Sequence, residues 1–287
     1  MGITDSMGFD NQFGRPSQVG IVAVVALVCL SGVGIANDQW KVFVISWIGF
    51  IAMAGAAIPG SRTETTNAGQ LVWGYGLASG AMIASASIFL VPQAVGFSAT
   101  VGGIGIAVGI LLGYGAHTIG HRLSHVESFG TVAVQLSAHS LAGGAIIGLV
   151  YATLPDLGLL LGLSIVSHKG PAGYAAARRL SRRGNATSVL LVPAAAVGLA
   201  ALPASMLNLP VSMAGNAIIS GIATGIFLHI AMDFLPQCDT GSEIGQAVGQ
   251  KESDAVHAEL DRLRVHAVVS TVLGSGAVVL AWAVLTL

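Results

Sequence analysis

The sequence predicts an all-α membrane protein, a polytopic bundle of transmembrane helices. Of its 287 residues, 54% are hydrophobic and only 9% are charged, which is too few charges to cover the surface of a soluble protein of this length. Glycine occurs 39 times, and small residues let helices approach closely in lipid, which supplies no hydrophobic drive for helix association. A net charge of −1 argues against a nucleic-acid partner, so composition predicts the lipid bilayer as the main partner.

Nine apolar segments of about 20 residues are long enough to cross a bilayer as helices. Most connections between them are short. The polar stretch 237–265 is the longest exception, and it is predicted to be an aqueous loop with one helical piece. The predicted spans are 18–37, 42–60, 71–93, 100–121, 130–153, 157–180, 187–206, 213–236 and 266–286.

Basic residues are divided unequally between the two sides of this predicted bundle. Ten fall on one side and only Lys41 on the other, and cytoplasmic loops are the ones that carry excess Lys and Arg. The N-terminus and the 237–265 loop are therefore predicted to face the cytoplasm. We expect the first span to be retained, and its small residues at 34–36 leave a cleaved signal sequence as the alternative. The ten basic residues are Arg15, Arg62, Arg122, Arg178, Arg179, Arg182, Arg183, Lys251, Arg262 and Arg264.

Two spans carry a similar pattern although they cross the membrane in opposite directions. In one, Gly76-Leu-Ala-Ser-Gly80 leads to Pro92-Gln93, and in the other Gly221-Ile-Ala-Thr-Gly225 leads to Pro236-Gln237. Transporters are often built from inverted repeats that hold a site between two halves. The pattern predicts such a repeat, and chance similarity between Gly- and Ala-rich helices is the alternative.

Away from the segment ends, the predicted spans contain one acidic and one basic residue, Asp233 and Lys169. Charges at this depth are expensive and are usually paired or functional. Their predicted depths differ by roughly 6 Å, which a lysine side chain can cover, so an ion pair is predicted if the two spans are neighbours. Pro171 and the glycines around it predict a broken or bent helix, which is tolerated at membrane depth where it lines protein or water.

His139 and His168 lie well inside adjacent predicted spans. Neutral imidazole is a good ligand for zinc and related ions, so these two residues are candidate metal ligands. Ser140 could add an oxygen and Met82 a thioether. Hydrogen bonds across helices are the alternative role for the histidines, and packing is the alternative role for Met82.

A second set of histidines, His117, His121 and His125, repeats at a spacing of four residues. This spacing places all three on one helix face, where they could form a cytoplasmic metal relay, although a solvated polar helix end is the simpler interpretation. His229 comes one turn before Asp233 and is predicted on the same face. The sequence has no HExxH, GxSxG or Walker-type motif, so no enzymatic activity and no bound cofactor are predicted.

Four stretches resemble the ZIP family of divalent metal transporters. They cover 77–94, 138–148, 167–179 and 221–237, with the sequences LASGAMIASASIFLVPQA, AHSLAGGAIIG, SHKGPAGYAAARR and GIATGIFLHIAMDFLPQ. The resemblance extends over eight spans at 42–286, so residues 1–41 would form a tail and one extra helix in front of a ZIP-like domain at 42–287. It implies transport of zinc or a similar divalent cation toward the cytoplasm by motion of one helix group, in a multi-pass protein of the plasma membrane, with a homodimer left open.

Carried over residue by residue, the resemblance places His139, Ser140 and His168 at ligand positions. Met82 falls where a methionine ligand can occur, and Asp233 falls at the acidic position before the seventh family helix's proline. The chain departs from the family where carboxylates or amides are usual, at Gly143, Lys169 and Ala172. Our hypothesis is that Lys169 is a fixed cation in place of a second metal ion. The same departures allow a ZIP-fold protein that does not transport metal and acts as a sensor or binding protein.

Overall fold

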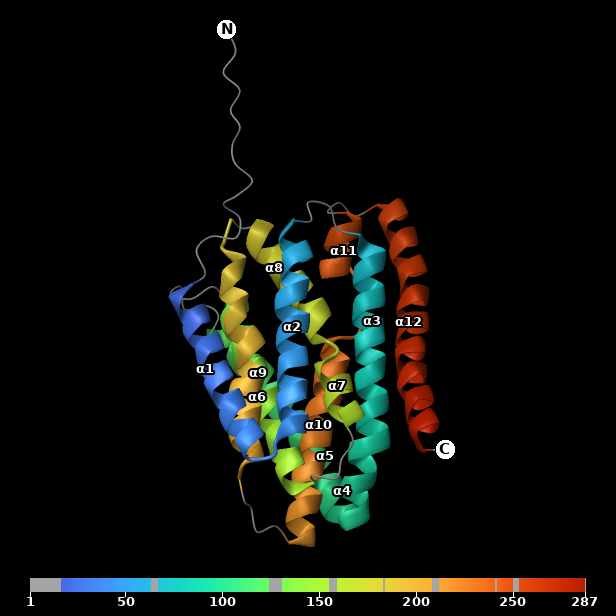
Figure 1. The fold of residues 1–287 in the computed structure, drawn as a ribbon. Coiled ribbons are helices and arrows are strands. Elements are labelled where there is room, and N and C mark those ends of the chain that lie inside the picture. Colours follow the sequence, from blue (N-terminus) through green and yellow to red (C-terminus); the bar gives the residue numbers. More distant parts are fainter. Residues whose placement is uncertain are drawn as a thin grey trace.

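Regular secondary structure in the described part of the chain is entirely helical, with no strand. Figure 1 shows the helices of this computed structural model running side by side in one bundle. The structure describes residues 17–62, 67–123, 131–154, 159–182, 184–207, 212–240, 242–249 and 253–286.

Seven of the described helical segments are long and apolar enough to cross a membrane. Helices satisfy their backbone hydrogen bonds internally, which is required in a medium without water. The chain is therefore a multi-pass helical membrane protein. Three of the segments are the whole helices α1 (Gln18–Ala36), α2 (Trp40–Arg62) and α10 (Met213–Asp233). Two are parts of longer helices, namely Leu136–Thr153 of α6 (Thr131–Thr153) and Asp254–Val284 of α12 (Asp254–Thr286). The segment Thr187–Ser205 contains α9 (Leu191–Ser205), and the segment Ala68–Phe97 consists of α3 (Ala68–Ser85), a π-helical turn and α4 (Val91–Phe97).

Two of the nine predicted spans have a different form in the structure. α5 (Ala99–Leu123) contributes a shorter apolar stretch, Ala99–Gly115. The predicted span 157–180 is divided into α7 (Leu159–Val166) and α8 (Lys169–Arg182). The predicted break is confirmed, but it falls at residues 167–168 and not at Pro171, because the first turn of a helix has no internal partners for its N–H groups and so tolerates proline.

The polar stretch 237–265 contains more helix than expected. Besides the short α11 (Glu243–Val248), the last helix begins at Asp254 and continues into the apolar part without interruption. Ion pairs one turn apart join Arg262 to Glu259 and Arg264 to Asp261, and such pairs support exposed helix. The last transmembrane helix therefore projects beyond the apolar region that the sequence defines.

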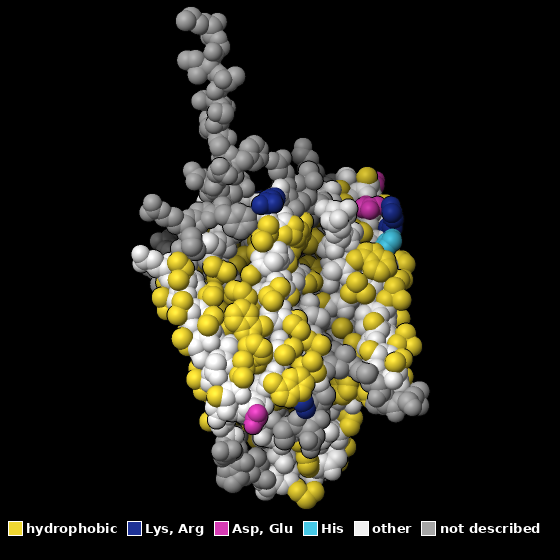
Figure 2. All heavy atoms as spheres, viewed as in Figure 1, with side chains coloured by type: hydrophobic (Ala, Val, Ile, Leu, Met, Phe, Trp, Pro, Cys, Tyr) yellow, Lys and Arg dark blue, Asp and Glu magenta, His cyan; other side chains and the backbone are white. Residues whose placement is uncertain are grey.

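The surface has the distribution of side chains that a bilayer requires. Figure 2 shows hydrophobic side chains covering the middle of the visible face, with charged ones toward the two ends. Large apolar side chains such as Val22, Leu111 and Val272 are 63–69% exposed, which lipid but not water accommodates. Figure 1 places the C-terminal ends of α2 and α8 at the same end of the bundle as the start of α12, so the described basic helix ends lie together.

The helices pack in two groups. The α3 group consists of α3, α4, α5, α10 and α12, in which α3 packs along α12 and α5 along α10. The α6 group consists of α1, α2, α6, α7, α8 and α9, in which α2 packs along α8 and α6 along α9. In each of these four pairs a Cβ added to a glycine would overlap the partner helix's backbone, as at Gly80, Gly225, Gly173 and Gly144.

Contact between the two groups is looser. Among the glycines of the described helices, each position where an added Cβ would overlap a neighbouring helix's backbone lies within one group. Across the boundary, a Cβ at Gly74 of α3 would lie 3.7 Å from Pro171 of α8, an ordinary contact distance. Backbones therefore interlock within each group, while side chains make the contacts between the groups.

Candidate functional site

Two histidines that are distant in sequence meet inside the bundle. His139 lies in α6, and His168 lies in the turn between α7 and α8. Their ring centroids are 5.6 Å apart and the ring planes are inclined at 86°. His168 is 3% exposed, and His139 is partly exposed. The structure thus brings together the two histidines that the sequence singled out, and the break between α7 and α8 positions one of them.

Lys169 begins α8 directly after His168, and its side chain crosses to α6. Its Nζ donates a 2.9 Å hydrogen bond to Oγ of Ser140, the residue after His139. Both side chains are buried, with exposures of 4% and 0%. A buried ammonium group is costly without hydrogen bonds, and bonds from a charged donor are stronger than neutral ones. The bond therefore joins α6 to α8 next to the histidine pair, and it engages the Ser140 oxygen.

Asp233 lies at the end of α10 and turns back toward its own helix. Its Oδ2 is 3.3 Å from Nε2 of His229, one turn earlier, and its side chain is 40% exposed. The predicted shared face of His229 and Asp233 is confirmed by this contact. The predicted pair of Asp233 with Lys169 needs correction, because the partner that the structure gives Lys169 is Ser140.

Met82 lies in the apolar interior. It is 1% exposed in the largest hydrophobic cluster, together with Ala86, Leu90 and Phe227. A π-helical turn, Ala86–Leu90, follows it at Ala86, and such turns often occur near functional sites. The contacts that place Met82 are those of a packing residue.

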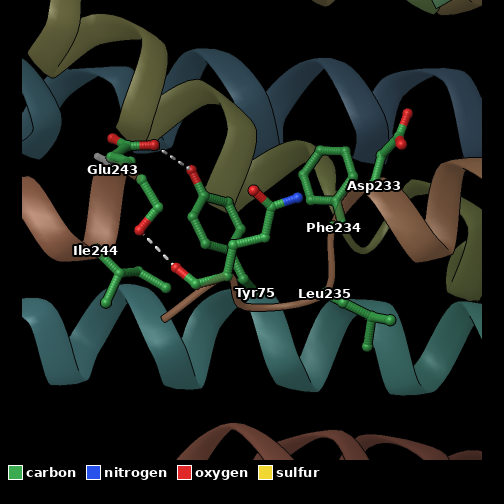
Figure 3. Close-up of a pocket in the computed structure, with 8 residues that line it drawn as sticks. Tyr75, Asp233, Phe234, Leu235, Glu243 and Ile244 are labelled. Carbon is green, nitrogen blue, oxygen red and sulfur yellow. Dashed lines mark hydrogen bonds between the residues drawn. The ribbon is translucent and has the colours of Figure 1, made fainter. Parts of the chain in front are cut away.

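A cavity of about 220 Å³ opens beside the end of α10. Figure 3 shows Tyr75 with its hydroxyl directed at Glu243 and with Phe234 beside its ring. The Tyr75 hydroxyl donates a 3.0 Å hydrogen bond to the Glu243 carboxylate, which ties α3 to α11. The cavity is lined by Tyr75, Asp233, Phe234, Leu235, Gln237, Ser242, Glu243 and Ile244.

Phe234 connects this cavity to the histidine pair. It lines the cavity, its ring centroid is 4.8 Å from that of His168, and it is 5.8 Å from that of Tyr75. Sequence reasoning missed Phe234, Tyr75 and Glu243. The only sequence signal for Phe234 was its place after the intramembrane Asp233 and before the helix-ending Pro236.

Among the described residues, the remaining candidates form no larger metal-binding group with the histidine pair. The side chains of His117, His121 and His125 lie outside the described residues. Where described, the chain has no group of three or more His, Cys, Asp or Glu side chains arranged to hold a metal ion. A Cβ added at Gly143, one turn after His139, would meet no atom within 4 Å, so there is open space beside this residue.

Searches against models of known families and against curated proteins find no match for this chain. The fold and the buried polar residues therefore define the class of protein directly. It is a multi-pass, all-α membrane protein with a histidine pair and a hydrogen-bonded lysine inside the bundle.

Proposed function

We propose that the protein is a membrane transporter that carries zinc or a similar divalent cation toward the cytoplasm, as its resemblance to the ZIP family implies. The observation that carries this proposal is the meeting of His139 and His168, with ring centroids 5.6 Å apart, at a break in a helix inside the bundle. Imidazole nitrogens are suitable ligands for such ions. Broken helices at membrane depth are a common way of building a transport site.

The proposed topology has nine crossings. Seven are the long apolar segments, the eighth is α5, and the ninth is formed by α7 and α8 together. α2 to α12 then correspond to the eight family spans, and α1 is an additional retained helix that is held to α2 by a 2.9 Å hydrogen bond from Trp47 Nε1 to Ser31 Oγ. The basic residues at the ends of α2 and α8 and at the start of α12 support a cytoplasmic location for that side of the bundle. The proposed membrane is the plasma membrane.

The packing of α3 and α10 supports the inverted repeat. The Gly76 and Gly80 positions of α3 lie against α12, and the Gly221 and Gly225 positions of α10 lie against α5. The two similar sequence patterns thus make the same kind of close contact with different partners. Equivalent roles for α3 and α10, and for α12 and α5, are what an inverted repeat requires.

The two helix groups support transport by relative motion. His139 and His168 both belong to the α6 group, so the two candidate ligands would move together. Interlocked backbones resist sliding within a group, because a packed interior cannot deform continuously. The α6 group would therefore carry the cation past the α3 group, across the boundary where side chains make the contacts.

Lys169 is assigned the role of a fixed cation at this site. Its ammonium is hydrogen bonded to Ser140, a residue at a family ligand position, so it would take the place of a second metal ion. The same contact favours the second candidate function, a binding or sensing protein of this fold that does not transport metal. In that case the engaged Ser140 and the missing carboxylate at Gly143 would leave the histidine pair able to bind a cation without passing it on.

Zinc uptake into proteoliposomes tests the proposal. We expect His139→Ala and His168→Ala to lose uptake, and His257→Ala, an exposed histidine on α12, to retain it. Zinc-dependent thermal stabilisation, measured on the same variants, reports binding separately. Histidine-dependent stabilisation without uptake would select the binding protein, and equal uptake by all variants would refute the metal site.

A further inference from the structure

We propose that Phe234 is the cytoplasmic gate of this pathway, an aromatic side chain that closes the histidine pair off from the cavity at the end of α10. The assignment of a cation as the passing solute rests on the proposed function. The gate itself rests on geometry, because one ring lines the cavity and also contacts His168.

The position of Phe234 is fixed by the end of α10. Its backbone N–H donates to the Ile230 carbonyl at 3.1 Å, so it is the last residue to follow the helical path. Pro236 follows two residues later, and the residue before a proline avoids helical geometry. The ring is thereby held at the point where the helix stops and the lining of the cavity begins.

A second aromatic ring also packs against Phe234. Tyr75 packs edge-on against it, at 5.8 Å and 68°, and the Tyr75 hydroxyl is anchored by Glu243 of α11. Phe234 and Tyr75 belong to the α3 group, so they remain together when the other group moves.

His168 belongs to the α6 group, so its contact with Phe234 crosses the boundary between the groups. The rings lie 4.8 Å apart at 60°, a favourable edge-to-face arrangement. This ring contact favours the closed arrangement, and displacement of the α6 group breaks it.

The chemistry around the ring suits the release of a cation. The Phe234 ring contacts an imidazole, and it also lines a cavity whose lining includes Asp233 and Glu243. An apolar constriction blocks an ion because the ion would have to shed its water to pass. When the ring contact opens, the carboxylates offer the cation oxygen ligands on the way to the cytoplasm.

Thiol accessibility tests the gate without any metal. The free cysteines Cys29 and Cys238 are replaced by serine, and His139→Cys supplies one reporter beyond the gate. A membrane-impermeant methanethiosulfonate reagent is added to the cytoplasmic side of inside-out vesicles. With Phe234→Ala the modification rate should rise about tenfold, because losing an edge-to-face ring contact at the upper end of its usual strength changes an equilibrium by about that factor.

Leu235→Ala is the matched control, because Leu235 also lines the cavity but comes after the gate residue. Leu235→Ala should leave the modification rate unchanged. Phe234→Leu keeps an apolar side chain of similar bulk, so it should raise the rate by a smaller factor, and it guards against misfolding of the alanine variant. Equal rates with Phe234 and Phe234→Ala, or an equal rise with Leu235→Ala, would overturn the gate. A rise specific to Phe234→Ala, in a protein that takes up no zinc, would keep the gate and reject the cation as its solute.

Discussion

The close contact of α10 with α5 gives a prediction whose size follows from the structure. A Cβ at Gly225 would overlap the Ile106 carbonyl oxygen and lie 2.7 Å from the Ile110 nitrogen. Because both obstacles are backbone, Gly225→Ala must push the helices apart, and overpacking of this kind costs about 1–3 kcal/mol. Alanine returns about 0.5–1 kcal/mol through its better helix propensity, so a net loss of up to about 2.5 kcal/mol is expected.

The matched control for this prediction is Gly103→Ala on the outer face of α5, where an added Cβ meets no atom within 4 Å. At about 2–4 °C per kcal/mol for a larger domain, Gly225→Ala should lower the thermal midpoint by up to roughly 10 °C. Gly103→Ala should leave the midpoint unchanged or raise it. The assay is fluorescence-detected size exclusion after heating in detergent, at one heating rate because membrane proteins unfold irreversibly. Gly80→Ala should behave like Gly225→Ala if the repeat is real. Equal midpoints for Gly225→Ala and Gly103→Ala would refute the reasoning.

Three further changes test the site and its surroundings. Ser140→Ala leaves the Lys169 ammonium buried without its acceptor and should cost about 1.5–3 kcal/mol of stability in thermal unfolding. Adding Lys169→Met to the Ser140→Ala variant should restore most of that stability. If it restores none, the lysine is not the source of the loss. Ser31→Ala removes the acceptor of the Trp47 hydrogen bond and should cost about 1 kcal/mol, detected as a lower thermal midpoint. If the double variant Ser31→Ala, Trp47→Phe shows a change of similar size, the two residues act as a pair. Gly143→Asp places a carboxylate in open space beside His139 and should tighten zinc binding about ten- to hundredfold in zinc-dependent thermal shift assays, whereas unchanged binding would place the ion elsewhere.

The membrane class and the broken helix could be predicted because they depend on local sequence. A run of apolar residues has to be helical in lipid whatever its neighbours are. The break near Pro171 followed from proline chemistry, and the His229–Asp233 contact from the four-residue spacing of a helix. The exact position of the break did not follow, because proline fits the first turn of α8 as well as it fits a kink.

The partners of the buried side chains could not be predicted in the same way. Which residues meet across helices depends on the rotation and depth of each helix, and these are set by backbone contacts at glycines such as Gly144 and Gly173. The sequence placed Lys169 and Asp233 within reach of each other, but the packing of α6 on α8 gave the lysine a serine. Phe234 was overlooked because an aromatic residue in an apolar stretch carries no signal until its neighbours are known.

By itself the sequence determined that this chain is a multi-pass helical membrane protein with two histidines at depth in its apolar segments. Those properties follow from the free energy of placing each segment in lipid, which is a property of the segment alone. The tertiary structure decided that the two histidines touch, that Lys169 bonds to Ser140, and that Phe234 both contacts His168 and lines a cavity. These contacts depend on how closely the helices approach one another, and that is set by packing between segments far apart in the chain.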